Sequence, residues 1–372
     1  MEMENNHEVK DWAKSKHILC VSVDNMGDLL MSGPAISALK ETFNCKITLL
    51  TSYNAAEVAK IIPGIDEVIV ADLPWVKLGD HPEPEYLKKL IDILNKHTFD
   101  GCVIFSVYSQ NVLPTALMAY LAGIPLRLSY SRENPYHLLT NWVPDPEPYF
   151  YSIHQVERDL DLVRMIGAET KDKHLHVTIN AESARSAKAK AKKAGIDLSK
   201  SYVILHPDAS DEKRRFPEDL WISAGRLLVS RLGLQVLVTG SVAEEPLAQT
   251  IAMGIGSDAH SAAGLFDLSE FAAVIKTAQT LVSVNTATIH LAAAVNKPLV
   301  VLYARTNPQH KPWLVQHKLL AYSVPDNQRG KNQVIKYVND QYYKQEVLYP
   351  SVMEILKAVQ DLLSIDILKE EK

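Results

Sequence analysis

The chain has 372 residues, a formal net charge of −5 and a hydrophobic fraction of 47%. This length favours two domains with separate cores, and the acidic balance argues against a nucleic-acid-binding surface. No apolar run approaches the roughly 20 residues that cross a bilayer, and the acidic first residues lack a signal-peptide pattern. We therefore expect a cytoplasmic protein.

Cysteine and histidine patterns do not predict a metal site. Cys20, Cys45 and Cys102 fall in apolar, strand-like runs, and no C-x-x-C pair occurs. They are typical of buried thiols in a reducing compartment. His174 and His176 would share one face of a strand, but no third ligand lies near them in the sequence. We expect no metal and no cofactor.

Strands and helices alternate along the first half of the chain. We predict strands at 17–23, 46–51, 67–71 and 101–107, and helices at 32–42, 55–61, 85–97, 111–123 and 156–166. Apolar strands separated by helices indicate a parallel sheet that is covered on both faces. Between residues 131 and 151 prolines and aromatics crowd together, which predicts a long irregular loop of the kind that often carries function.

The same alternation returns in the second half, after an extended segment at 171–179. We predict helices at 181–194, 218–232, 246–253 and 268–278, strands at 202–206, 235–239, 280–284 and 299–303, and a final amphipathic helix at 351–363. The expected domains are an N-terminal domain at 1–175 and a C-terminal domain at 176–345, followed by a C-terminal helix at 346–372 that packs back on the N-terminal domain.

The most informative segment follows a buried strand of the second half. Asn285 and Thr286 are preferred N-cap residues, and an alanine-rich helix starts directly behind them. Such a junction presents unpaired N–H groups and a partial positive charge, which suit a phosphate, although ordinary strand–helix junctions look alike. Ala287 and Thr288 would lie in the first turn. His290, one turn on, either reaches the ligand or is buried against a carbonyl.

A cationic run follows another strand of the same half. Ligands of open α/β sheets bind outside the carboxyl ends of the strands, so this run and the capped junction would lie on one edge. A cationic run is usually a solvated patch, but its pairing with a second anion-suited segment favours a diphosphate site. The candidates are His206, for which a structural role is the alternative, Ser210, Lys213, Arg214, Arg215 and, nearer the nucleoside, Gly240.

Four blocks of the sequence, in this order, resemble the family 9 glycosyltransferases, which include the lipopolysaccharide heptosyltransferases. The blocks lie at 23–34, with the pair Gly27-Asp28, at 154–158, at 206–217 and at 285–308. The resemblance implies an α/β protein of the GT-B class, with two Rossmann-like domains whose parallel sheets face a central cleft. It also implies sugar transfer from a nucleotide diphosphate donor with inversion and without a metal.

The chain departs from the family pattern in the fourth block. Asn285, Thr286 and Ala287 stand where the family commonly has Asp-Thr-Gly, and Thr288 stands where it usually has proline. The missing carboxylate removes a charge from the expected donor site, and alanine narrows the approach of the backbone. These changes bear on the identity of the donor, for which ADP-heptose is one candidate.

By the same resemblance, Asp28 is the base that deprotonates the acceptor hydroxyl. The residues alone also allow Asp28 to cap the following helix, and Asp24 is a rival carboxylate. A free aspartate has a pKa of roughly 3.9, which partial burial would raise. The first domain is expected to hold the acceptor, with Gly27, Arg127 and Arg132 as candidates.

The expected function is therefore an inverting, metal-independent glycosyltransferase. It would move a sugar, with heptose as a candidate, from a nucleotide sugar to a saccharide or lipid-linked saccharide of the cell envelope. A lipid-linked acceptor implies peripheral contact with the inner membrane face. The alternative is a non-catalytic nucleotide-sugar-binding protein, to which Asn285 points. A nicotinamide-dependent oxidoreductase would carry G-x-G-x-x-G after its first strand, where this chain has Asp24-Asn-Met-Gly-Asp28.

Overall fold

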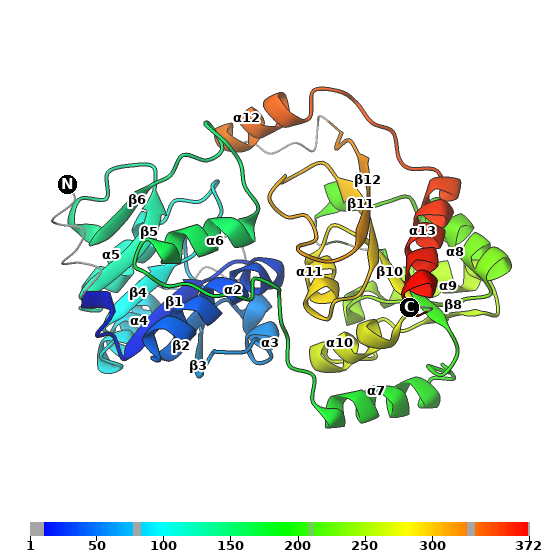
Figure 1. Cartoon of the computed structure of the whole chain (residues 1–372), viewed down its shortest axis with the longest axis horizontal. Helices are drawn as coiled ribbons and strands as arrows, with labels where there is room; N and C mark the ends of the chain where they lie inside the picture. The colour runs from blue at the N-terminus through cyan, green and yellow to red at the C-terminus, as the bar shows by residue number, and fades with distance from the viewer. Residues whose placement is uncertain (1–10, 77–82, 208, 210, 326–331, 371–372) are drawn as a thin grey trace. The chain divides into compact units, whose positions relative to one another are not determined.

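The structure is a computed structural model that describes residues 11–76, 83–207, 209, 211–325 and 332–370. The chain divides into two compact units, residues 1–176 and 177–372. Each unit contains one six-stranded parallel sheet with helices packed against it (Figure 1). Both units are thus layered α/β domains.

In the first unit, the chain order reverses in the middle of the sheet. The strands are β1 (His17–Ser22), β2 (Lys46–Thr51), β3 (Glu67–Val70), β4 (Gly101–Ile104), β5 (Leu126–Ser131) and β6 (Asn141–Pro144). They lie in the order β3-β2-β1-β4-β5-β6. Ligands of such sheets bind at the carboxyl ends of the strands where the order reverses. In this sheet that point lies between β1 and β4.

Helices of the first unit bury the central strands completely. They are α2 (Met26–Phe43), α3 (Ala56–Ala59), α4 (Pro84–Lys96), α5 (Leu113–Leu121) and α6 (Gln155–Arg164), with short 3-10 turns η1 (Tyr53–Ala55) and η2 (Tyr136–Leu138). Leu19 and Val21 of β1 share a core with α4 and α5, whereas α2 and α6 pack along each other (Figure 1). Because all of residues 18–21 are fully buried, both faces of β1 are covered.

Two sequence predictions in this unit are wrong. The helix predicted at 32–42 begins six residues earlier, at Met26, and therefore includes Gly27 and Asp28 in its first turn. The region predicted as a long irregular loop contains η2 and the strand β6. Pro144 ends β6, which lies at the edge of the sheet, where a proline removes no ladder hydrogen bond.

The second sheet repeats the topology of the first. Its strands are β7 (Tyr202–His206), β8 (Gln235–Val238), β9 (Ala259–Ser261), β10 (Thr280–Val284), β11 (Leu299–Ala304) and β12 (His317–Tyr322). The order β12-β11-β10-β7-β8-β9 gives the same arrangement when the strands are counted from β7. The order reverses between β7 and β10, so a ligand of this unit is expected there.

The helices of the second unit include the C-terminal helix, which was predicted to pack on the first domain. They are α7 (Ala181–Lys193), η3 (Glu212–Arg214), α8 (Glu218–Leu232), η4 (Val242–Glu244), α9 (Glu245–Ile255), α10 (Leu268–Thr277), α11 (Ala287–Ala294), α12 (Gln333–Tyr342) and α13 (Val352–Glu370). α13 packs against α8 and β11 (Figure 1). Its apolar face, with Ile355, Val359 and Leu362, completes the core of the second unit, so that prediction is wrong.

Candidate active site

Asp24 and Gln110 meet at the switch point of the first sheet, which is the place between β1 and β4 where the strand order reverses. Asp24 follows β1, and Gln110 lies in the loop between β4 and α5. The Nε2 of Gln110 donates a hydrogen bond to Oδ2 of Asp24, while its Oε1 accepts from the N–H of Val107 at 3.2 Å. The amide thus joins the two loops at the place where a ligand is expected.

Asp28 is the third residue of α2 and is half-buried. Its Oδ2 accepts a hydrogen bond from the N–H of Asn25 at 3.3 Å, so the side chain does cap the helix. Capping does not exclude base catalysis, because a carboxylate has about four acceptor positions. The helix N-terminus also stabilises its ionised form. Gly27 is buried in the same turn.

Two carboxyl groups near the start of α2 hold their protons more tightly than usual. Burial, followed by the negative charge of Asp28, raises the pKa of Asp24 to about 7, although the hydrogen bond from Gln110 lowers it. Burial also raises the pKa of Asp159 in α6 to about 7. A carboxylate with a pKa near neutrality is a better proton acceptor than an ordinary aspartate. Asp24 and Asp28 therefore interact electrostatically at the start of α2.

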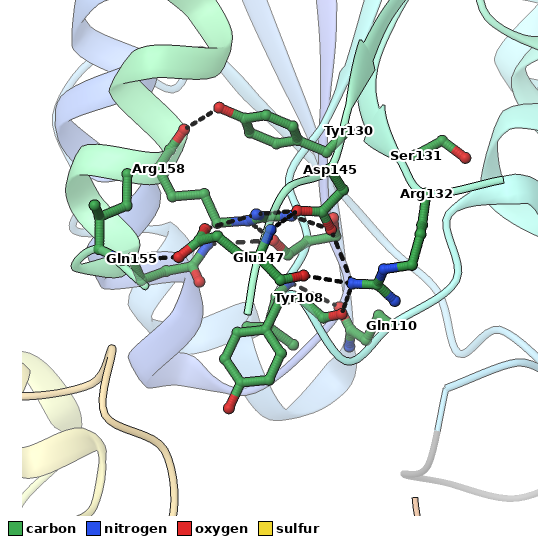
Figure 2. Close-up of polar contacts among 12 residues, drawn as sticks. Tyr108, Gln110, Tyr130, Ser131, Arg132, Asp145, Glu147, Gln155 and Arg158 are labelled. Atoms are coloured by element: carbon green, nitrogen blue, oxygen red, sulfur yellow. Dashed lines mark hydrogen bonds and ion pairs between the residues drawn. The ribbon is translucent and has the colours of Figure 1, made fainter. Parts of the chain in front are cut away.

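A buried ion-pair network holds the loop after β6 against α6 (Figure 2). Arg158 is 1% exposed and donates to Asp145 Oδ1 at 2.8 Å and to Glu147 Oε2 at 2.7 Å. Its guanidinium also lies 4.2 Å from the ring centroid of Tyr130. Because each charge has a hydrogen-bonded partner, the attraction within the network offsets the desolvation penalty of burying these groups. It fixes the proline-rich segment beside the carboxyl ends of β4 and β5.

The two arginines predicted to bind the acceptor differ in their surroundings. Arg132 Nη2 donates to the carbonyl of Glu147 at 2.6 Å and to that of Tyr108 at 3.0 Å, so it belongs to the same network (Figure 2). Arg127 is buried, and its guanidinium donates only to neighbouring backbone carbonyls among its hydrogen bonds. These carbonyls belong to Ile124, Pro125, His137 and Leu138. The contacts of Arg127 therefore support a structural role in place of the predicted one.

His206 and Arg214 reach the switch point of the second sheet. His206 Nε2 lies 3.1 Å from Thr288 Oγ1, and its Nδ1 lies 3.0 Å from Thr239 Oγ1. Arg214 Nη1 donates to the carbonyl of Asn285 at 3.0 Å. These contacts join the loops and the helix that follow β7, β8 and β10. They bring a guanidinium to the N-terminus of α11.

Asn285 supports the strands through its side chain. Its Nδ2 donates to the carbonyl of Ala304 at 3.2 Å and to Thr306 Oγ1 at 3.1 Å, and its Oδ1 accepts from the N–H of Ala304 at 3.1 Å. An ionised aspartate could not donate these bonds. Thr286 is the N-cap of α11, and its Oγ1 accepts from the N–H of Thr288 at 3.4 Å. The side chain of Asn285 thus ties β10 to β11.

The other predicted donor residues lie around this point. Lys213 pairs with Asp211 at 2.8 Å, Arg215 is exposed, and Ala287 is half-buried in the first turn of α11. A Cβ atom at Gly240 would lie 2.8 Å from Glu244 Oε2, so a larger residue there would displace the side chain of Glu244. Ser210 lies outside the described residues.

The structure adds a second histidine to the predicted His290. His290 is buried in α11, and its ring centroid lies 6.3 Å from that of His310. Burial, followed by the charge of Arg214, lowers the pKa of His310 to about 4, so its ring is neutral at pH 7. His310 could not be predicted as a site residue, because it lies in an irregular segment behind β11. Gln110 and Asp159 were also missed.

The described ranges contain neither a candidate membrane-spanning helix nor a candidate metal site. No helix there is long and apolar enough to cross a membrane. In the same part of the chain, no group of three or more His, Cys, Asp or Glu side chains is arranged to hold a metal ion.

Comparisons with known proteins agree on one family. The model of glycosyltransferase family 9 (heptosyltransferase) matches residues 89–343. Lipooligosaccharide heptosyltransferase 2 of Haemophilus influenzae is 22% identical over 305 residues, which cover 80% of this chain and 85% of that protein. Lipopolysaccharide heptosyltransferase 3 of Escherichia coli is 24% identical over 295 residues, covering 77% and 83%.

Solved structures show the same fold. A glycosyl transferase family 9 protein from Veillonella parvula superposes with a TM-score of 0.74 at 18% identity, covering 94% of this chain and 97% of that one. The ADP-heptose lps heptosyltransferase II of E. coli gives 0.70 at 20% identity, covering 96% and 100%. Together with the two sheets, these likenesses confirm the predicted α/β fold of the GT-B class.

Proposed function

The chain belongs to glycosyltransferase family 9 and is a glycosyltransferase, and we propose that it transfers heptose from ADP-heptose to a lipopolysaccharide-type acceptor. The proposed reaction inverts the anomeric centre and needs no metal ion. One observation carries the proposal: the side chains at the two switch points have opposite charge. Carboxylates gather at the first, whereas Arg214 meets the N-terminus of α11 at the second. The names of the similar proteins support the choice of donor and acceptor.

The second unit is proposed to bind the diphosphate of the donor. The positive end of the α11 dipole and the guanidinium of Arg214 supply positive charge where the leaving group develops negative charge. His206 orients Thr288 in that turn. The further residues proposed for the donor are Lys213, Arg215, Gly240, Thr286, Ala287 and His290.

The first unit is proposed to supply the base. A carboxylate oxygen of Asp28 takes the proton of the acceptor hydroxyl while the acceptor oxygen bonds to the anomeric carbon of the donor. The bond from that carbon to the phosphate oxygen breaks at the opposite face, and ADP leaves with the electron pair. This single displacement inverts the centre. General base catalysis of this kind contributes about 10²–10⁴-fold. The charge of Asp28 in turn helps to raise the pKa of the neighbouring Asp24.

Substitution of the base tests the proposal. Asp28→Asn should lower kcat for transfer from ADP-heptose to truncated lipopolysaccharide by at least about 100-fold and leave ADP binding, measured by calorimetry, unchanged. Asp161→Asn, at a partly exposed aspartate of α6, is the matched control. Transfer that survives in Asp28→Asn would contradict the base assignment. ADP binding by the wild type without any transfer would favour the non-catalytic alternative.

A thermal-shift series with ADP, UDP, GDP, CDP and TDP tests the nucleotide separately. A ligand at about 100 times its Kd stabilises the folded state by about 2.7 kcal/mol. We expect the largest rise with ADP. A larger rise with another nucleoside diphosphate would replace ADP-heptose as the proposed donor and leave the transfer chemistry in place.

We also propose that the protein works in the cytoplasm, in peripheral contact with the inner membrane face that carries the acceptor. Tyr136 and Phe150 support this, because they are 80% and 86% exposed and aromatic rings favour the membrane interface. Tyr136→Ser combined with Phe150→Ser should reduce sedimentation with anionic liposomes. Absence of wild-type binding at low salt would argue for a soluble acceptor.

A further inference from the structure

A buried hydrogen-bonded chain links α6 to the turn of α2 that carries Asp28. The Oγ of Ser32 lies 3.2 Å from the backbone carbonyl oxygen of Asp28 and 2.7 Å from Oδ2 of Asp159. Gln155 Nε2 donates to the other oxygen of Asp159 at 2.9 Å. Ser32 and Asp159 are 2% and 1% exposed. This hydrogen-bonded chain of side chains therefore crosses the interface between α2 and α6 without access to bulk water.

The hydrogens along this chain can be assigned by counting donors. Ser32 has one hydroxyl hydrogen, so it cannot donate both to the carbonyl of Asp28, four residues earlier in α2, and to an ionised Asp159. Both contacts are satisfied when Asp159 carries a proton: its O–H donates to Ser32 Oγ, and the Ser32 hydroxyl donates to the carbonyl of Asp28. The geometry thus accommodates a neutral carboxyl group with both contacts of Ser32 satisfied.

The surroundings of Asp159 support a proton at neutral pH. The groups that face it are Ser32 and Asp28 from α2, Gln155 and Arg158 from α6, and Tyr130 from β5. Burial has the largest effect and raises the pKa of Asp159 to about 7, against the lowering by Ser32, Arg158 and Gln155. Arg158 is at the same time paired with two other carboxylates, Asp145 and Glu147.

We propose that Asp159 is a positioning residue for glycosyl transfer: as a neutral acid it fixes, through Ser32, the first turn of α2 and with it Asp28. The proposal rests on the proposed role of Asp28 as the base. Ionisation of Asp159 would draw the hydroxyl of Ser32 away from the carbonyl of Asp28. It would also place a second negative charge near the base.

Three variants separate positioning from mere packing. Asp159→Asn keeps a donor for Ser32 and an acceptor for Gln155 but cannot ionise, whereas Asp159→Leu and Ser32→Ala break the chain. With ADP-heptose and truncated lipopolysaccharide, Asp159→Leu and Ser32→Ala should each lose about tenfold or more in kcat, because a displaced base is costly. The KM for ADP-heptose should stay unchanged, since the donor belongs to the other unit. Asp159→Asn should stay within about threefold of the wild type.

The pH profile gives a second signature. Wild-type kcat should fall as the pH rises through about 7, where Asp159 and Asp24 both ionise, and the fall should be smaller in Asp159→Asn, in which only Asp24 titrates there. The aspartate carboxyl carbons, followed by nuclear magnetic resonance, report the same event without activity. Of the resonances that titrate at about pH 7, those of Asp24 and Asp159, one should be missing in Asp159→Asn. If every such resonance persists in Asp159→Asn, the neutral state of Asp159 is overturned.

Several outcomes would overturn the proposal. Full kcat in Ser32→Ala would show that the chain does not position the base, even if Asp159→Leu failed to fold. An Asp159→Asn variant as impaired as Asp159→Leu would show that a negative charge is needed. Asp161→Leu, on the same helix at a partly exposed position, is the control. Transfer that survives in Asp28→Asn but not in Ser32→Ala would refute the proposed base and not the importance of the chain.

Discussion

At position 285 the hydrogen bonds of the asparagine side chain disfavour the aspartate that the family pattern has there. We expect Asn285→Asp to destabilise the protein by about 1–3 kcal/mol, because a carboxylate oxygen would face the carbonyl of Ala304 without a hydrogen to donate. Urea denaturation at pH 7 measures this. Asn54→Asp, at an exposed position, should change the free energy of unfolding little. Equal stability of the two variants would show that the loop rearranges around the new side chain.

Burial of Asp159 makes the free energy of unfolding depend on pH. Its pKa is about 7 in the folded state and roughly 3.9 in an unfolded chain, so between these values the folded state binds more protons. The stability contributed by its protonated form is complete below about pH 4 and lost as the pH rises through about 7. Asp159→Asn should therefore gain up to roughly 4 kcal/mol relative to the wild type between about pH 4 and pH 8. Urea denaturation over this range tests the sign, and a constant difference would contradict it.

At the scale of elements, α13 belongs to the core of the second unit. Ile355 is fully buried on its inner face, whereas Met353 is 60% exposed. We expect Ile355→Ala to cost about 2–5 kcal/mol of unfolding free energy, because it leaves a cavity between α13 and α8. Met353→Ala, two residues away, should have a small effect. Chemical denaturation of both variants compares them, and similar values would argue against the packing of α13.

Some elements were predictable from the sequence and others were not, for identifiable reasons. β1 could be predicted from the apolar run at 17–23, because a strand buried on both faces is continuously apolar. The start of α2 was misplaced because Gly27 and Pro34 oppose helix formation locally, while packing against α6 overrides them. The family resemblance marked Asp28. The partner of Asp24, Gln110, lies 86 residues away, and only the strand order brings the two together.

At the scale of the whole molecule, the proposal assigns the donor and the base to different units. Hydrogen exchange can test this assignment. Saturating ADP should slow exchange about tenfold in η3 and in the first turns of α11, because bound ligand suppresses local opening. Exchange in the first turn of α2 should be unchanged. Protection of α2 as strong as that of α11 would show that the nucleotide also contacts the first unit.

The repeated strand order has a consequence for how such a chain can change. Two sheets with the same winding are what duplication of one ancestral half, followed by divergence, would produce. In the present chain the switch point of one half carries the carboxyl groups of Asp24 and Asp28, and that of the other half carries the guanidinium of Arg214. The boundary at 176 and 177 interrupts no strand or helix. With the donor and acceptor sites assigned as proposed, halves exchanged between relatives at this boundary would inherit donor choice and acceptor choice as separate traits.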